Sequence, residues 1–230
     1  MLTVSMQRNR PAILFRSALV AATLTLGGHA NADAALPIRP DLNPGGWEML
    51  RFKGVPETTF LAAPDGAMDV RADKSSSVLY LKIADDPVAA TRLSWDWQVI
   101  DALPATDLTK TDGDDRMLSI YVAFSDGSMA SKLKAMISPL AAGNVLNYVW
   151  GGVAKLDIPH PHFPDSGRLI VKRTIAAPTG RWLSETVDLE ADYRRAFGVP
   201  PPGIAYIGIS GDADDLARVS RGLIRNITLE

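Results

Sequence analysis

Two acidic stretches and one arginine are the residues of this sequence best suited to chemistry. Asp114, Asp115 and Arg116 stand directly before the apolar run Met117 to Phe124, in "DGDDRMLSIYVAF". Carboxylates can bind a cation or accept hydrogen bonds from sugar hydroxyls, and arginine can hold an anion in its planar fork. The alternative is structural. If Met117–Phe124 is a strand, Arg116 is in phase with the core, so we expect it to be buried and paired with a carboxylate.

The second acidic stretch is "GDADD", Gly211 to Asp215. Its aspartates, Asp212, Asp214 and Asp215, fall in a predicted loop, where closely spaced carboxylates can bind calcium. The spacing does not complete an EF-hand loop, and a solvated turn is the alternative. Convergence of the two acidic stretches at one end of a sheet would favour a structural calcium ion. Otherwise no cofactor is expected.

Aromatic spacing suggests a third kind of site. Tyr148 and Trp150 in "LNYVWGG" are two residues apart, so on a strand they share one side. Such rings can stack on the apolar face of a sugar. The same spacing in "LSWDWQV" has apolar residues in phase on both sides, so Trp95 and Trp97 are expected in the core. The predicted ligand-binding residues are Tyr148, Trp150, Asp114, Arg116 and Asn147.

Catalysis is a separate hypothesis. Glycosidases use two carboxylates about 5–9.5 Å apart, and the candidates for acid and base are Asp114, Asp115 and Glu185. No G-x-S-x-G, H-E-x-x-H or P-loop motif is present. His160 and His162 form a His-x-His pair, which would need a distant carboxylate to complete a metal site.

The elements that must position these residues are short and mostly extended. Apolar alternation broken by turn residues predicts about eleven strands between Trp47 and Leu229, with helices over 128–141 and 188–198. No βαβ rhythm and no internal repeat is present. This pattern predicts an all-β protein: an antiparallel two-sheet sandwich, jelly-roll-like, with one or two short helices in its connections. Residues 47–230 are expected to form a single domain after a Pro-rich leader, residues 33–46.

The N-terminus predicts export. Arg8, Arg10 and Arg16 precede a short apolar run, 17–28, and a small-x-small cleavage site ending at Ala32. We interpret residues 1–32 as a cleaved signal peptide, whose apolar run is too short for a membrane span. Losing its three arginines changes the net charge from −2 to −5, which argues against nucleic-acid binding. The chain has no cysteine, so disulfides and a lipoprotein anchor are excluded. We expect a periplasmic or secreted protein.

Several motifs together resemble a known family. The segments "LSWDWQV", "DGDDRMLSIYVAF", "LNYVWGG", "RWLSETVDLEADYRRAFG", "PPGIAYIGISGDADD" and "IRNITLE" follow one another in the order and spacing of Domain of Unknown Function family 3047. The resemblance spans about Trp47 to Glu230. It implies an exported β-sandwich and brings no established reaction with it.

Three functions remain open from the sequence. The leading hypothesis is a periplasmic binding module for a saccharide or cell-envelope glycan. The first alternative is a carbohydrate-active hydrolase or lyase that uses Asp114, Asp115 or Glu185. The second is a structural partner in an envelope assembly, which would expose an apolar patch of more than a few hundred Å².

Overall fold

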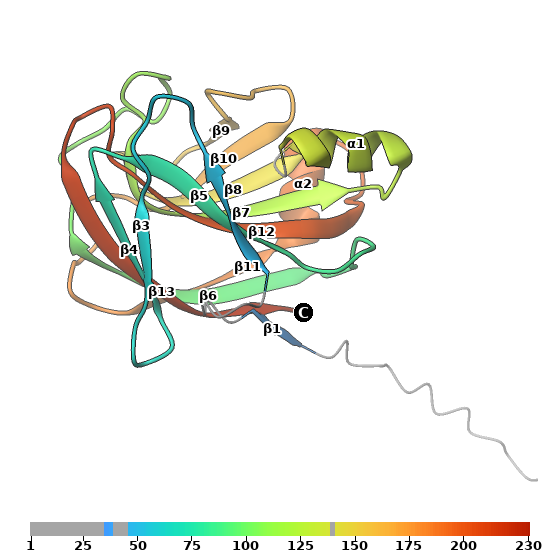
Figure 1. Ribbon diagram of the computed structural model, residues 1–230, viewed down its shortest axis with the longest axis horizontal. Helices are drawn as coiled ribbons and strands as arrows, with labels where there is room; N and C mark the ends of the chain where they lie inside the picture. The colour runs from blue at the N-terminus through green and yellow to red at the C-terminus, as the bar shows by residue number, and fades with distance from the viewer. Residues whose placement is uncertain (1–34, 39–45, 139–140) are drawn as a thin grey trace, which may run out of the picture. The chain divides into compact units, whose positions relative to one another are not determined.

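The computed structural model describes residues 35–38, 46–138 and 141–230, and these form a β-sandwich of two sheets (Figure 1). The predicted signal peptide lies outside the described residues, as does most of the Pro-rich leader. The predicted fold class is confirmed. All eleven predicted strands are present, and among the described residues the sequence pattern missed two short edge strands, β1 (Leu36–Ile38) and β9 (Asp157–Pro159).

One sheet has six strands in the order β11-β6-β13-β4-β3, with β1 paired to β13. Its remaining strands are β3 (Thr59–Ala62), β4 (Met68–Asp73), β6 (Arg92–Asp101), β11 (Leu183–Asp188) and β13 (Val219–Leu229). Every pair in this sheet is antiparallel.

The other sheet has seven strands in the order β2-β5-β12-β7-β8-β10-β9. Besides β9, these are β2 (Trp47–Arg51), β5 (Ser76–Lys82), β7 (Arg116–Ser125), β8 (Val145–Trp150), β10 (Gly167–Arg173) and β12 (Gly203–Asp212). The expectation of a wholly antiparallel sandwich is wrong at one place, because β8 and β10 are parallel. The chain between them includes β9 and returns to the same end of the sheet, which a tight hairpin could not do.

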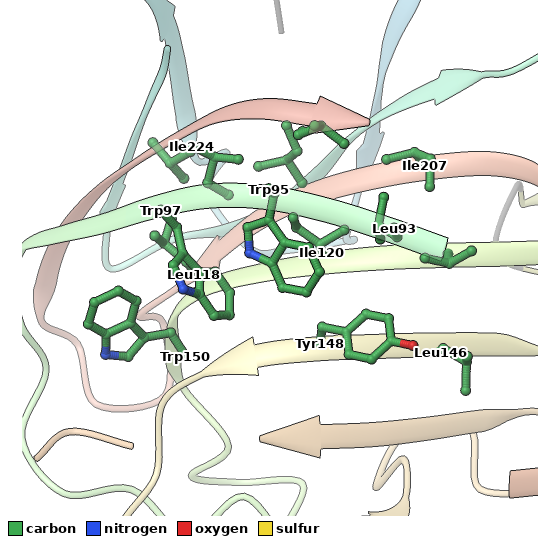
Figure 2. Packing of buried hydrophobic residues seen from close by; sticks show 14 of the residues in the cluster. Leu93, Trp95, Trp97, Leu118, Ile120, Leu146, Tyr148, Trp150, Ile207 and Ile224 are labelled. Carbon is green, nitrogen blue, oxygen red and sulfur yellow. The ribbon is translucent and has the colours of Figure 1, made fainter. Parts of the chain in front are cut away.

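An aromatic cluster fills the space between the two sheets (Figure 2). Trp95 and Trp97 project from β6 toward Tyr148 and Trp150 of β8, with ring centroids 5.6 Å apart for Trp95–Tyr148 and 5.5 Å for Trp97–Trp150. The core position of Trp95 and Trp97 is confirmed. The predicted stacking platform of Tyr148 and Trp150 is wrong: their exposed fractions are 0% and 1%, so neither ring has a face open to a sugar.

Two short helices lie in connections, as predicted. α1 (Met129–Ile137) begins after Ser128, whose hydroxyl accepts a hydrogen bond from the amide of Ser131. α2 (Leu189–Phe197) is capped by the carboxylate of Asp188 and ends at Gly198, whose φ of 74° favours glycine. Within the described part of the chain, neither these helices nor any other is long and apolar enough to cross a membrane.

The outward side of the seven-stranded sheet carries its own apolar layer, and we call this side the outer face. Here Val78, Tyr121, Ala123 and Val145 form a buried cluster separate from the main core. The partly buried Leu50, Phe163 and Tyr206 pack against them. Phe163 belongs to the loop between β9 and β10, so a loop covers part of the outer face, and hollows beside it are the places where a ligand can reach the sheet.

Candidate functional site

A cavity of about 590 Å³ lies on the outer face, where β7 begins and β12 ends. We call it the acidic pocket. Its apolar wall is formed mainly by Leu50, Phe52, Val55 and Phe163. Its charged and polar lining includes Asp114, Arg116, Tyr121, His162, Asp212, Asp214 and Asp215. Both acidic stretches of the sequence thus meet in one place, as a shared site requires.

A β-bulge brings Arg116 into this pocket. Between two paired positions, β12 has one residue where β7 has two, Met117 and Leu118. An extra residue interrupts the alternation of side chains, so residues before the bulge change sides relative to an unbroken strand. Arg116 therefore reaches the outer face, where its guanidinium bonds to Ser119 and Tyr121. The phase argument, which placed Arg116 over the main core, is wrong for this reason.

The prediction that Arg116 is buried and paired is confirmed. Its exposed fraction is 4%, and Nη1 lies 2.8 Å from Oδ2 of Asp114 and 3.0 Å from Oδ2 of Asp212. Nε donates to Ser119 Oγ at 3.1 Å, and Nη2 donates to Tyr121 Oη at 2.8 Å. Burial alone would lower the pKa of Arg116, but these neighbours raise it well above its usual value. Arg116 is therefore a permanent cation whose donors are directed at the protein.

Asp115 joins the two acidic loops without lining the pocket. Its carboxylate accepts hydrogen bonds from the backbone amides of Asp215 and Leu216, at 3.2 and 2.8 Å. These bonds tie the loop before β7 to the loop after β12. Burial raises the pKa of Asp115, the amides oppose the shift, and the nearby Asp214 and Asp215 add to it.

Negative charge exceeds positive charge around the pocket. Burial raises the pKa of Asp212 well above its usual value; Arg116 opposes this shift and Asp214 increases it. Burial also raises the pKa of Asp215, and the charge of Asp214 adds to this. Four aspartates line the pocket beside one arginine, so its acidic groups outnumber that cation.

Three carboxylates are close enough to share a metal ion, with oxygens within 4.8 Å of one another: Asp115, Asp212 and Asp214. The predicted calcium set contained Asp215 in place of Asp115. Asp215 lines the pocket but does not belong to this group. Two of the three already have partners, since Asp212 pairs with Arg116 and Asp115 bonds to two amides.

The two histidines flank the pocket in different states. His160 is buried and stacks on Phe163 with ring centroids 3.8 Å apart, and burial lowers its pKa to about 2, so it is neutral. His162 is half exposed, with Nε2 3.1 Å from Oδ1 of Asp114. The predicted ligand residue Asn147 is fully buried and contacts His160 at 3.3 Å, so it supports the wall and does not line the cavity.

The three proposed catalytic carboxylates do not share one cleft. Asp114 lines the pocket, whereas Asp115 is turned toward the amides of the neighbouring loop. Glu185 belongs to β11 of the other sheet, where it accepts hydrogen bonds from Trp97 and Arg173. An acid–base pair that includes Glu185 is therefore not assembled.

Some pocket residues carry no strong signal in the sequence. Phe52 and Val55 follow β2 in the turn "FKGVPE", and Phe163 stands among prolines in "HPHFPD". Isolated aromatic residues in loops are ordinary surface features, so their spacing indicates no site. Phe52, Val55 and Phe163 meet in one wall because β2 pairs with β5 and because the chain returns through β9.

The family resemblance can be tested directly. The model of the family described as "Protein of unknown function (DUF3047)" matches residues 45–228. The chain belongs to DUF3047. The match includes the whole acidic pocket, so this site lies in the DUF3047 region of the chain. No curated protein matches the sequence.

Solved structures similar to this DUF3047 chain are carbohydrate-binding modules. One is a family 11 module from Clostridium thermocellum in complex with a beta-1,3-1,4-mixed-linked tetrasaccharide. It is 12% identical, with a TM-score of 0.45 over 85% of this chain and 94% of that one. Another is a family 29 module variant complexed with mannohexaose, 12% identical, with a TM-score of 0.41 over 85% and 89% of the two chains. Likeness of this degree concerns the sandwich architecture and carries no information about a ligand.

Proposed function

We propose that this protein is an exported saccharide-binding module, and that the acidic pocket holds the saccharide. The observation that carries the proposal is one cavity, of about 590 Å³, with a floor rich in acceptors and an apolar wall. A sugar ring has the matching surfaces: hydroxyl donors around its edge and an apolar face of C–H groups. The cavity volume is within the usual range of small-molecule sites, about 300–1,000 Å³.

The hydrogen-bonding groups of the floor favour a neutral, donor-rich ligand. The guanidinium of Arg116 is already bonded to Asp114, Asp212, Ser119 and Tyr121, so it is not free to bind an anion. What remains for a ligand is carboxylate oxygens, which accept strong hydrogen bonds from hydroxyl groups. Asp214 and Asp215 add further acceptors to the lining.

The wall supplies the contact that sets a sugar apart from other polar molecules. Phe52 is 40% exposed at the pocket and belongs to the same wall as Leu50 and Phe163. An apolar sugar face packed there leaves water, while its hydroxyl edge bonds to the floor. This position replaces the buried Tyr148 and Trp150 as the aromatic contact.

The test is calorimetric titration of the exported protein with neutral, acidic and amino oligosaccharides. We expect a neutral envelope-type glycan to bind, and Phe52→Ala and Asp214→Asn to weaken that binding. The matched control is Leu61→Ala, because Leu61 is 41% exposed on β3 of the other sheet. Absence of binding across all classes, or an unchanged affinity in Phe52→Ala, would contradict the proposal.

Export is part of the proposal and has its own test. The basic and apolar segments of residues 1–32 have the form of a signal peptide. We expect the protein recovered from the periplasm or the medium to begin at Asp33 by mass spectrometry. A protein retained in the cytoplasm with its first residues intact would refute this.

Neither alternative function is favoured by a specific observation. Of the candidate catalytic residues, Glu185 lies on the other sheet, apart from Asp114 and Asp115. The exposed large apolar side chains of the described residues are spread over the six-stranded sheet, α1 and several loops, among them Leu61, Met136 and Val219.

A further inference from the structure

A second hollow, of about 440 Å³, lies on the same outer face. Its lining includes Lys82, Ser125, Lys132, Met136, Ala205 and Tyr206. The chain after α1 borders both cavities, because Ser138 and Ala141 line the acidic pocket and Ala142 lines the second hollow. The two cavities are therefore neighbours on one surface.

Strand register shows how the two cavities are related. The strands β5, β12 and β7 run side by side in the seven-stranded sheet (Figure 1), and each contributes to both cavities. The acidic pocket takes Ser76 from β5, Asp212 from β12 and Arg116 from β7, while the second hollow takes Lys82, Tyr206 and Ser125 from the same strands. Ser76 pairs with Asp212 and Lys82 with Tyr206, six residues away in each strand. The first pair, in the acidic pocket, is thus about 20 Å along the strands from the second pair, in the second hollow.

An aromatic pair occupies the surface between them. Tyr80 lies on β5 between Ser76 and Lys82, and its ring meets that of Tyr206 edge to face, with centroids 6.0 Å apart. The hydroxyl of Tyr80 donates to Glu48 at 2.5 Å, which fixes the Tyr80 ring. Both rings are partly exposed, so they offer apolar surface at the second hollow and on the way to it.

We infer that the ligand is a chain of several sugar units that lies along β5 and β12, with one unit in the acidic pocket and another against Tyr206. This inference rests on the proposed function and adds a second subsite to it. A single sugar cannot contact both Asp212 in the acidic pocket and Tyr206 in the second hollow, whereas a chain can. Once one unit is bound, the second contact is intramolecular, so affinity rises with chain length by roughly 10²-fold or more when the span fits.

The experiment measures affinity against chain length, with β-1,4-linked glucose and β-1,4-linked mannose oligomers of one to six units as probes. We expect affinity in the parent protein to rise with length and then level off. Tyr206→Leu keeps an apolar side chain but loses the flat ring, so it should lose most of the gain while its affinity for the shortest ligand that binds stays within about twofold. Tyr206→Phe keeps the ring and should retain the gain. Leu61→Ala on the other sheet is the control.

The outcomes separate this inference from the proposed function. A chain-length gain that is lost in Tyr206→Leu and kept in Tyr206→Phe supports the second subsite. Equal affinity for all lengths, or a gain that persists in Tyr206→Leu, overturns the inference and leaves saccharide binding intact. No binding of any oligomer by the parent protein overturns both. Melting curves of the two Tyr206 variants check that each is folded.

Discussion

Replacing Arg116 by alanine is the perturbation with the largest expected effect on stability. The substitution leaves Asp114 and Asp212 buried, with side-chain exposed fractions of 3% and 9%, and removes the cation that compensates them. It also leaves Ser119 and Tyr121 without their guanidinium partner. Breaking a buried ion pair by removing one partner costs about 3–5 kcal/mol. In a domain of this size that corresponds to a fall in Tm of roughly 6–20 °C.

Thermal and urea unfolding of Arg116→Ala beside the parent provide the assay. Arg194→Ala is the control, because Arg194 forms an exposed i,i+4 pair with Glu190, and such pairs contribute up to about 1 kcal/mol. Arg116→Lys should recover part of the loss, since it restores the charge without the fork. Combining Arg116→Met with Asp114→Asn and Asp212→Asn should be more stable than Arg116→Ala, because no unpaired charge remains buried. A parent-like Tm for Arg116→Ala would refute this reasoning.

Three further outcomes are expected. Because the folded state raises the pKa of Asp212, the protonated side chain stabilises the fold, and this stabilisation is complete below about pH 4 and is lost as the pH rises through the folded pKa. The Tm of Asp212→Asn relative to the parent should therefore rise with pH. A pH-independent difference would contradict this. If the carboxylates of Asp115, Asp212 and Asp214 bind calcium, millimolar Ca²⁺ should raise the Tm of the parent but not of Asp214→Asn; identical curves with Ca²⁺ and with chelator would exclude the ion. Calorimetry should show weaker binding of oligomers that contain uronic acid than of neutral ones, most clearly at low salt, because the pocket is negative. Equal affinities would show that the charge of the pocket does not discriminate between acidic and neutral saccharides.

The fold was predictable because its signals are local. Alternating apolar residues, turn dipeptides and helix caps are set by neighbours in the sequence, and they located every strand of the sandwich except β1 and β9. Those two strands have three residues each at sheet edges, too short for an alternation to show. The parallel pairing of β8 and β10 was equally hidden, since direction depends on how the chain returns and not on either strand's residues.

The site was predictable only where its residues are charged. The pairing of Arg116 followed from the cost of burying charge, whereas the meeting of the two acidic stretches entered only as a condition for a calcium ion. The aromatic contact could not be predicted, because two-residue spacing places Tyr148 and Trp150 on one side of the strand without showing which side is covered. Here that side faces Trp95 and Trp97 of the opposite sheet. Phe52 and Phe163 reach the pocket through loops, which no periodicity describes.

One glycine lies opposite the bulge that turns Arg116 toward the pocket. A Cβ on Gly211 would lie 2.9 Å from a methyl carbon of Val70 and 3.2 Å from the carbonyl oxygen of Met117, so a side chain there would press against both β4 and β7. Close approach of β12 at this position accompanies the bulge in β7 that turns Arg116 outward. A larger residue at Gly211 would therefore disturb the loops and the arginine together.

The arginine serves the pocket by being unavailable to ligands. If its donors were free, the pocket would attract anions; because they are bound by Asp114, Asp212, Ser119 and Tyr121, the surface left to a ligand accepts hydrogen bonds and carries negative charge. The carboxylates in turn can be buried beside an apolar wall only because the guanidinium offsets part of their charge. Scaffold and site are thus the same group of residues, so changes to Arg116 should alter stability and ligand preference together, whereas changes to Phe52 should alter affinity alone.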